Sequence, residues 1–173
     1  ISHNAAQAAK VMAIQTAETK SKLLNDMAIA LRVGKAEIFK ANAIDIEFAV
    51  KNGLSESMVD RLQLNDQRIE DMAVGLETVA KLPDVVGTIK DQDVMPNGLK
   101  ISKMRIPLGV ICMIFEARPN VTADAAGLCI KSGNAVILRG GKEALNSSLA
   151  IAKVLQDVLT AYQLPKEIIT VIA

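Results

Sequence analysis

Apolar positions in the first half of the chain recur every three or four residues, which is the spacing of one face of an α-helix. Gly34 and the pair Asn52-Gly53 interrupt this pattern at positions typical of helix ends, and Pro83 closes it. Ser55 and Asn65 are side chains suited to cap the last two helices. The pattern predicts packed helices over residues 2–19, 22–33, 35–52, 55–61 and 66–82. In the third of these, the predicted buried stripe is Ile38, Ala41, Ile44 and Phe48.

From residue 85 onward the pattern becomes typical of strands. Residues 86–90 and 99–104 predict two strands joined by Pro96-Asn97-Gly98, whose Asn-Gly pair is a hairpin turn signal. A two-stranded ribbon alone is marginally stable in water, so it must pack on something. The alternatives are an arm that reaches a partner and an ordinary edge hairpin on the same domain. The side chains available for such packing are Ile89, Leu99, Ile101 and Met104.

The stretch from residue 107 to residue 143 predicts the centre of the fold. Residues 108–115 are almost uninterruptedly apolar, which is typical of a strand covered on both faces. A crossover helix over 121–131, a strand over 135–138, a helix over 142–162 and a strand over 168–172 follow. Two consecutive right-handed βαβ units would place both helices on one face of a parallel sheet. The fold class is therefore α/β.

Ligands of open α/β sheets bind where strands end and helices begin, because backbone donors and the positive end of the helix dipole converge there. Two such ends are present, at residues 116–120 and 139–143. We expect these two loops to open side by side onto one cleft.

Composition limits the classes of function. Lys and Arg number 20 against 19 Asp and Glu, and the aromatic residues number four, so neither a basic field nor a base-stacking surface is expected and a nucleic-acid partner is not predicted. No run of 18 or more apolar residues and no signal peptide occur in the sequence, which favours a soluble cytoplasmic protein without a membrane partner.

The cysteines and the single histidine do not suggest a site. Cys112 and Cys129 fall in apolar stretches and are interpreted as unpaired structural thiols, the alternative being that one of them is a nucleophile. His3 lies near the start of the chain, far from both cysteines, so no zinc site of usual spacing can be assembled and no metal is predicted.

The segment EARPNVTADAAGLCIKSGNAVILRGGKEA, preceded by IPLGV, strongly resembles the gamma-glutamyl phosphate reductases, also called glutamate-5-semialdehyde dehydrogenases. These form a branch of the aldehyde dehydrogenase superfamily, and the turn Arg118-Pro119-Asn120 and the run Arg139-Gly140-Gly141 distinguish the branch. The resemblance extends along nearly the whole chain. It implies the first part, under half, of such an enzyme, since the chain starts at Ile1 and stops at Ala173 within an expected strand.

The resemblance implies a division into three parts. Residues 1–84 would be the helical part of the cofactor-binding domain, 85–105 a hairpin oligomerisation arm, and 106–173 the βαβαβ part of the NADP-binding domain, with the catalytic domain absent. The arm of this family joins a sheet completed by another subunit, so a homo-oligomer built on dimers is expected.

The resemblance also implies an activity, the second step of proline biosynthesis. L-glutamyl 5-phosphate is reduced by NADPH to L-glutamate 5-semialdehyde with release of phosphate, through a thioester on a cysteine that lies outside this chain. The chain alone would then be inactive. The alternative is a truncated cofactor-binding or oligomerisation fragment without catalytic activity.

Site residues are carried over position by position. Asn120 would donate to the oxyanion through its side-chain amide, the alternative being that it only caps the helix beginning at Val121. Arg118 would bind the phosphate or carboxylate of the substrate, the alternative being an ion pair with Glu116 or Asp124.

The second loop would bind the cofactor through Arg139, Gly140, Gly141, Lys142 and Glu143. The family's usual Lys-Pro is Arg-Gly here, and the positive charges of Arg139 and Lys142 suit the 2′-phosphate of NADPH. The alternative is a plain strand-to-helix turn whose glycines serve the backbone. No GxGxxG motif is present.

Overall fold

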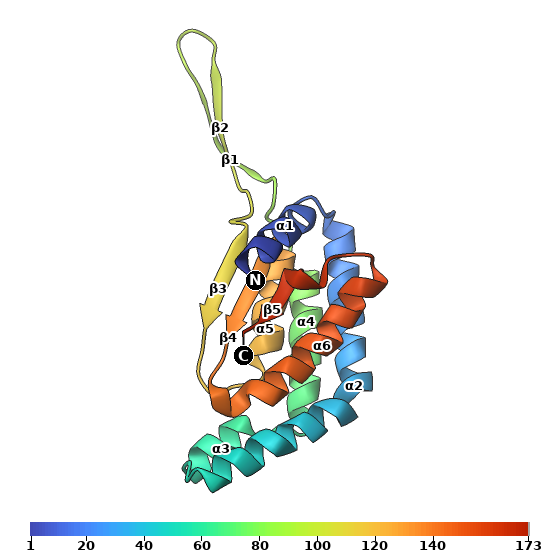
Figure 1. Ribbon diagram of the computed structural model, residues 1–173. Coiled ribbons are helices and arrows are strands. Elements are labelled where there is room, and N and C mark those ends of the chain that lie inside the picture. The colour runs from blue at the N-terminus through green and yellow to red at the C-terminus, as the bar shows by residue number, and fades with distance from the viewer. Residues whose placement is uncertain (173) are drawn as a thin grey trace.

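The computed structural model describes residues 1–172, and Ala173, the last residue of the predicted third part, lies outside the described residues. The chain forms a body of helices around a short sheet, from which a hairpin projects (Figure 1). The α/β class predicted from the sequence is confirmed. The helices are α1 (Ser2–Ala13), α2 (Ala17–Lys51), α3 (Glu56–Leu62), α4 (Asp66–Lys81), α5 (Val121–Lys131) and α6 (Leu145–Ala161). The strands are β1 (Ile89–Val94), β2 (Lys100–Met104), β3 (Val110–Ile114), β4 (Ala135–Arg139) and β5 (Ile169–Val171), with short 3₁₀ turns η1 (Lys142–Ala144) and η2 (Lys166–Ile168).

The first two helices divide differently from the prediction. Helix α1 ends at Ala13, and α2 begins after Thr16, whose hydroxyl oxygen accepts the backbone N–H of Thr19 at 3.1 Å. The predicted helix over 2–19 is therefore too long, because the capping side chain of Thr16 restarts the helix.

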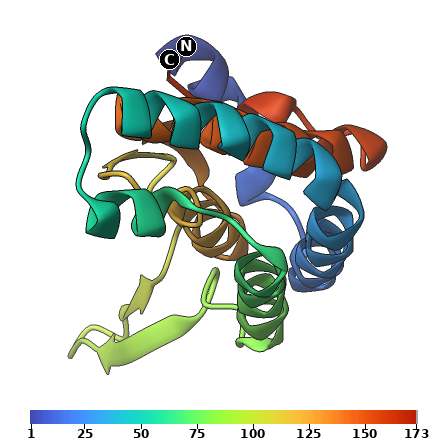
Figure 2. The ribbon, with the colours of Figure 1, turned by 90° about the horizontal axis from the view of Figure 1, so that it is seen from below.

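The predicted break at Gly34 is wrong, since α2 runs through it without interruption. The reason is tertiary packing. A Cβ at this position would lie 3.0 Å from Cγ2 of Val154 on α6, so the glycine permits the close approach of two helices. Figure 2 shows the second half of α2 running alongside α6.

Helices α3 and α4 cover nearly the same residues as predicted. The side chain of Asn65 caps α4 by accepting the N–H of Arg68 at 2.8 Å, as expected. Ser55 occupies the cap position of α3, but its hydroxyl makes no cap bond and lies 3.2 Å from that of Ser57.

Strands β3, β4 and β5 form a parallel sheet in that order, as the two predicted βαβ units require. Helices α5 and α6 contact one another and α2, on the sheet face that carries Val136 and Leu138. This one hydrophobic cluster joins the helices before residue 84 to the sheet after residue 106.

The opposite face of the sheet is open over β3. Helix α1 lies against β4 and crosses in front of it in Figure 1, and Ile137 is buried. On the neighbouring strand, Cys112 is exposed and Ile114 is 79% exposed. The predicted coverage of this strand on both faces is therefore wrong among the described residues, because an apolar sequence does not reveal whether a covering element belongs to the same body.

The hairpin of β1 and β2 is antiparallel and separate from the main sheet. Its first strand starts at Ile89, three residues later than predicted, and contains a bulge at Asp91, where φ is 56°. Every residue of both strands is exposed, so the hairpin does not pack on its own body. The edge-hairpin alternative is therefore wrong.

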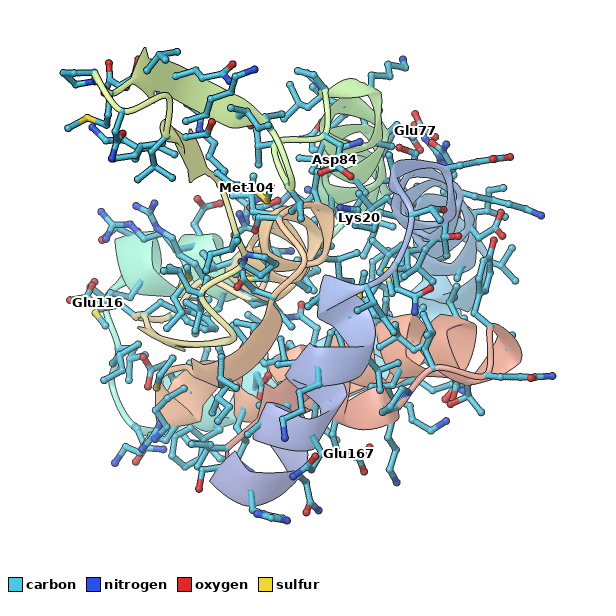
Figure 3. The ribbon with its side chains drawn as sticks, turned by 90° about the horizontal axis from the view of Figure 1, so that it is seen from above. Lys20, Glu77, Asp84, Met104, Glu116 and Glu167 are labelled. Atoms are coloured by element: carbon cyan, nitrogen blue, oxygen red, sulfur yellow. The ribbon has the colours of Figure 1, made fainter. Side chains whose placement is uncertain are left out.

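A buried ion pair fixes the base of the hairpin. Nζ of Lys20 lies 2.5 Å from Asp84, whose other oxygen accepts the N–H of Val86 at 3.0 Å (Figure 3). Desolvation raises the pKa of the Asp84 carboxyl, but the hydrogen bonds from Lys20 and Val86 and the nearby charge of Lys131 outweigh it, and the net pKa is lowered. The ionised carboxylate thus ties the segment leading into the hairpin to the start of α2.

Candidate functional site

The carboxyl ends of β3 and β4 lie at the same edge of the sheet, near α3 (Figure 1). The backbone N–H of Phe115 donates to the carbonyl of Arg139 at 3.0 Å, which joins the two strand ends directly. The loops that follow them are therefore adjacent, as the sequence predicts.

Two cavities lie at this edge. The first, of about 330 Å³, is lined by Arg61, Leu64, Arg68, Asp71, Met72, Arg118, Asn120 and Asp124. The second, of about 320 Å³, is lined by Met58, Arg61, Glu116, Ala117, Arg118 and Glu143. Arg61 and Arg118 line both cavities.

The second cavity touches both predicted loops. Glu116, labelled at the outer edge of the molecule in Figure 3, and Arg118 come from the first loop, while Glu143 comes from the second. Residues 139–142 line neither cavity. The two loops thus share a cleft through Glu143, and Arg139 lies outside it.

Asn120 occupies the cap position of α5 but makes no side-chain cap bond. Its Nδ2 instead donates to Oδ2 of Asp124 at 3.1 Å. The interpretation that Asn120 only caps the helix is therefore wrong. An amide nitrogen carries two N–H groups, so one of them is still available to a ligand in the cavity.

Asp124 holds this amide. Its Oδ1 faces α4, 3.6 Å from the position that a Cβ on Gly75 would take. Desolvation raises the pKa of the Asp124 carboxyl, and the hydrogen bond from Asn120 partly opposes that rise.

In the described part of the chain, no carboxylate oxygen of Glu116 or Asp124 lies within 4.0 Å of a guanidinium nitrogen of Arg118, so Arg118 forms no ion pair with either residue. The alternative that it only stiffens the turn through such a pair is therefore wrong. Its exposed guanidinium faces the cavities without a counterion.

The glycine pair of the second loop allows two close contacts. A Cβ on Gly140 would lie 3.2 Å from the ring of Phe115, and a Cβ on Gly141 would overlap the carboxylate of Glu143, which folds back over it. Arg139 is exposed and its Nη1 donates to the carbonyl of Gly140. Larger residues at 140 and 141 would displace Phe115 or Glu143.

The start of α6 is organised by a residue that sequence reasoning missed. Asp45 of α2 accepts the backbone N–H groups of Asn146 at 3.1 Å and of Ser147 at 2.7 Å. These donors at the helix start are therefore occupied by the protein itself and are not free for a ligand.

Asn42 extends this buried network. Its Nδ2 donates to the carbonyl of Leu62 at 2.8 Å and to Oγ of Ser147 at 3.0 Å, while its Oδ1 accepts the N–H of Leu64 at 2.8 Å. It thus fixes the segment after α3 relative to the start of α6. The buried stripe predicted for residues 35–52 is therefore wrong beyond Ile38. The buried positions of this part of α2 are Ile38, Asn42, Asp45 and Ala49.

The thiols differ in setting. Cys129 is buried, which raises the pKa of its thiol to about 11 and makes it a poor nucleophile, as expected of a structural residue. Cys112 is exposed on the open face of β3, away from the cavities, so its predicted burial is wrong.

In residues 1–172, no group of three or more His, Cys, Asp or Glu side chains is arranged to hold a metal ion. Within the same residues, no helix has both the length and the apolar character needed to cross a membrane.

The fold matches solved aldehyde dehydrogenases. An acetylating aldehyde dehydrogenase from Geobacillus thermoglucosidasius superposes with a TM-score of 0.71 at 18% sequence identity, over 98% of this chain and 35% of that one. The described residues therefore have the fold of part of an aldehyde dehydrogenase.

Within that class, the similarity to one branch is much higher. Gamma-glutamyl phosphate reductase from Thermotoga maritima superposes with a TM-score of 0.94 at 40% identity, over 98% of this chain and 41% of that one. The reductase of Shewanella denitrificans is 59% identical over 172 residues, which are 99% of this chain and 41% of the relative. No protein-family model matches the chain.

The resemblance to the gamma-glutamyl phosphate reductases is thus confirmed along nearly the whole chain. The chain spans about two fifths of the length of these relatives, since the covered share is 41%.

Proposed function

We propose that the chain is part of an NADPH-dependent gamma-glutamyl phosphate reductase. The reaction would convert L-glutamyl 5-phosphate to L-glutamate 5-semialdehyde with release of phosphate, in proline biosynthesis. The observation that carries this proposal is the 59% identity to such a reductase over 172 residues. The cleft that brings together Arg118, Asn120 and Glu143 is consistent with it.

In this reaction a cysteine thiolate attacks the acyl carbon, phosphate leaves, and the resulting thioester is reduced to the aldehyde, which regenerates the thiolate. The proposal places that cysteine outside these 173 residues, because neither thiol of the chain is suitable. Cys129 is buried with a raised pKa, and Cys112 lies away from the cleft.

Asn120 would stabilise the negative charge that develops on the acyl oxygen. Its amide is neutral at every pH, and the bond to Asp124 fixes the rotation of the amide plane. The remaining N–H can then donate to the oxyanion without reorganisation, which is the condition under which such a donor accelerates a reaction most.

Residues of the second loop fit a nucleotide cofactor. The absence of a Cβ on Gly140 and Gly141 leaves room for the ring of Phe115 and the carboxylate of Glu143, and this carboxylate can accept from a ribose hydroxyl. Arg139 and Lys142 are exposed cations that form no ion pair in the described region, and they suit a 2′-phosphate. The chemistry that NADPH supplies when bound is hydride transfer.

The test uses the protein encoded by the whole reading frame that contains this chain. Incubated with glutamate semialdehyde, phosphate and NADP, it should produce NADPH, because the reaction is reversible. Turnover that requires both phosphate and the aldehyde supports the proposal. Absence of phosphate-dependent turnover in a folded preparation contradicts it.

The preference for NADPH is tested separately with Arg139→Ala. Loss of the guanidinium should weaken NADPH binding and leave NADH binding nearly unchanged. If the ratio of the two affinities stays the same, Arg139 does not bind the 2′-phosphate.

A second candidate function is supported by the projecting hairpin, whose residues are all exposed. It would act as an arm that joins copies of the protein into a homo-oligomer built on dimers, in the cytoplasm. A chain that assembles but neither binds nucleotide nor turns over substrate would be an oligomerisation fragment only.

A further inference from the structure

Two arginines from different elements face the same space. Arg61 comes from α3 and Arg118 from the loop after β3, and both line both cavities of the cleft. Both are exposed, and neither forms an ion pair in residues 1–172. Two like charges around one cavity repel each other unless an anion lies between them.

Two other arginines of the chain, Arg68 and Arg32, are engaged by the protein. Arg68, next to them in the first cavity, donates to Oδ2 of Asp60 at 3.1 Å and to the carbonyl of Gln63 at 2.5 Å. Arg32 lies between two glutamates, with distances of 2.7 Å to Glu70 and 2.5 Å to Glu77. A structural role is therefore visible for these arginines and not for Arg61 or Arg118.

Carboxylates also face the cleft, two in each cavity. In the first, Asp71 accepts from Gln67 at 2.9 Å and Asp124 accepts from Asn120 at 3.1 Å. In the second they are Glu116 and Glu143. A cleft that presents both guanidinium and carboxylate groups does not suit a polyanion. It suits a small ligand with both charges, such as an amino acid that carries a phosphate and an ammonium group.

We propose that Arg61 and Arg118 together bind the phosphate of such an acyl phosphate. This inference rests on the proposed function and adds Arg61 as a substrate-binding residue. Each planar guanidinium can donate two parallel N–H bonds to phosphate oxygens, a geometry that a lysine ammonium cannot reproduce.

The position of the pair fits the chemistry assigned to Asn120. Arg118 and Asn120 are two residues apart on the same loop and line the same cavity as Arg61. A phosphate held by the two arginines therefore leaves the adjoining acyl group on the side of the Asn120 amide.

A phosphate in this cleft has two possible sources, the acyl phosphate and the nucleotide cofactor. The cofactor phosphates are assigned to the second loop, where Arg139 and Lys142 lie outside both cavities. The test therefore compares two probes, inorganic phosphate and adenosine 2′-monophosphate.

The experiment is a titration of the 173-residue chain, labelled with ¹⁵N and followed by two-dimensional NMR. Inorganic phosphate should shift the amide signals of Ala117 and Asn120 in a saturable way. Arg61→Met and Arg118→Met should each weaken this binding about tenfold, the loss typical of a charge-assisted contact. Arg61→Lys, which keeps the charge, should weaken it less.

Arg105→Met is the matched control. Arg105 is also exposed and without an ion pair in the described residues, but it lies at the base of the hairpin and lines neither cavity. Arg105→Met should bind phosphate with an affinity within about twofold of that of the parent, because a distant surface charge contributes little at ordinary salt. Thermal unfolding of each variant establishes that it is folded.

Three results would overturn the inference. They are phosphate binding by Arg61→Met equal to that of the parent, no saturable phosphate shifts in the parent, and shifts at Ala117 and Asn120 with adenosine 2′-monophosphate but not with phosphate. Because the titration needs neither cofactor nor turnover, it is separate from the test of the reductase activity. If the protein binds phosphate through Arg61 but shows no turnover, the phosphate site is supported and the proposed reductase activity is contradicted.

Discussion

The side chain of Asn120 donates from Nδ2 to Oδ2 of Asp124 at 3.1 Å, within the first turn of α5, and forms no cap to the helix. Its truncation should therefore cost the fold little. We expect Asn120→Ala to lower the free energy of unfolding by less than about 0.5 kcal/mol, as for a surface substitution without a special role.

Asn65→Ala is the matched control, because Asn65 caps α4 through the N–H of Arg68 at 2.8 Å. Loss of this cap in Asn65→Ala should lower the free energy of unfolding by about 1 kcal/mol. Urea unfolding of the two variants and the parent measures both values. Equal losses would show that Asn120 stabilises its helix as a cap does.

In the protein encoded by the whole reading frame, Asn120→Ala should lower kcat on the order of a hundredfold, as for loss of an oxyanion donor.

The carboxyl of Asp124 should make a pH-dependent contribution to stability. Desolvation raises its pKa above the ordinary value, and the hydrogen bond from Asn120 only partly opposes this. The folded state therefore keeps the proton to higher pH than the unfolded state does. This contribution is fully present below the ordinary pKa and is lost as the pH rises through the raised pKa.

Asp124→Asn removes the ionisation and keeps an oxygen that can accept from Asn120. Its free energy of unfolding should rise relative to that of the parent as the pH increases from about 3 to about 7. Denaturation at a series of pH values measures the difference. A difference that stays constant with pH would mean that the pKa of Asp124 is not raised in the folded chain.

Among the ion pairs of the fold, we expect substitution of the pair Lys20 and Asp84 to lower the free energy of unfolding most. Lys20 is 1% exposed and Asp84 17%, so removal of either partner leaves a charge with little access to water. Lys20→Met and Asp84→Asn should each cost about 3 kcal/mol at neutral pH, the loss typical of half a buried pair. The double variant should lose less than the sum of the two.

Lys35→Met is the comparison for this pair, because Lys35 and Asp66 form an ion pair with exposed side chains, and its loss should cost less than about 1 kcal/mol. The pKa of Asp84 is lowered, so its contribution is present above the ordinary carboxyl pKa and is lost as the pH falls through the lowered value. The effect of Asp84→Asn should accordingly shrink in acid. A cost at neutral pH no larger than that of Lys35→Met would contradict this account.

The order of helices and of the strands of the parallel sheet was predictable from periodicity, because each of these elements buries one face or both. What periodicity could not give were the features set by distant residues. Gly34 is typical of a helix end, yet it lies within α2 because Val154, 120 positions later in the numbering, packs against it. The exposure of Ile114 likewise depends on which elements cover β3, and neighbouring residues carry no such information.

Prediction of the candidate site was limited by the same cause. The loops at Asn120 and Glu143 were found because strand ends mark ligand sites in parallel sheets. Arg61 lies on a short helix whose charges have the ordinary pattern of a solvated surface, and only the fold brings it to the cleft. The polar residues Asn42 and Asp45, at helical spacing from Ile38, were an available signal, since a buried amide or carboxylate must have partners.

The packing of Gly34 against Val154 predicts strong coupling between these residues. An exposed Gly→Ala change within a helix would stabilise it by about 1 kcal/mol, but here the new Cβ would lie 3.0 Å from Cγ2 of Val154. We expect Gly34→Ala to destabilise the parent and to stabilise Val154→Ala by about 1 kcal/mol. Chemical denaturation of the four proteins of this cycle measures the coupling. Equal effects of Gly34→Ala in the two backgrounds would show that the helices separate without cost.

The hairpin is predicted to join copies of the protein. Ile101 lies on one face of β2, with Leu99 just before the strand, and Met104 lies on the other face, paired with Ile89, so both faces of the hairpin carry exposed apolar side chains. A small ribbon of this kind is marginally stable in water, and burial against a second copy would stabilise it.

Ile101→Asp should therefore convert the oligomer of the protein encoded by the whole reading frame to a smaller species. Size-exclusion chromatography with light scattering measures the mass. Ser102→Asp is the matched control, because it adds the same charge at the next position, on the other face and away from Leu99 and Ile101. Charge alone would dissociate the oligomer equally in both variants, whereas burial of the Ile101 face predicts the larger effect for Ile101→Asp. An unchanged mass for Ile101→Asp would mean that this face of the hairpin does not contact another copy.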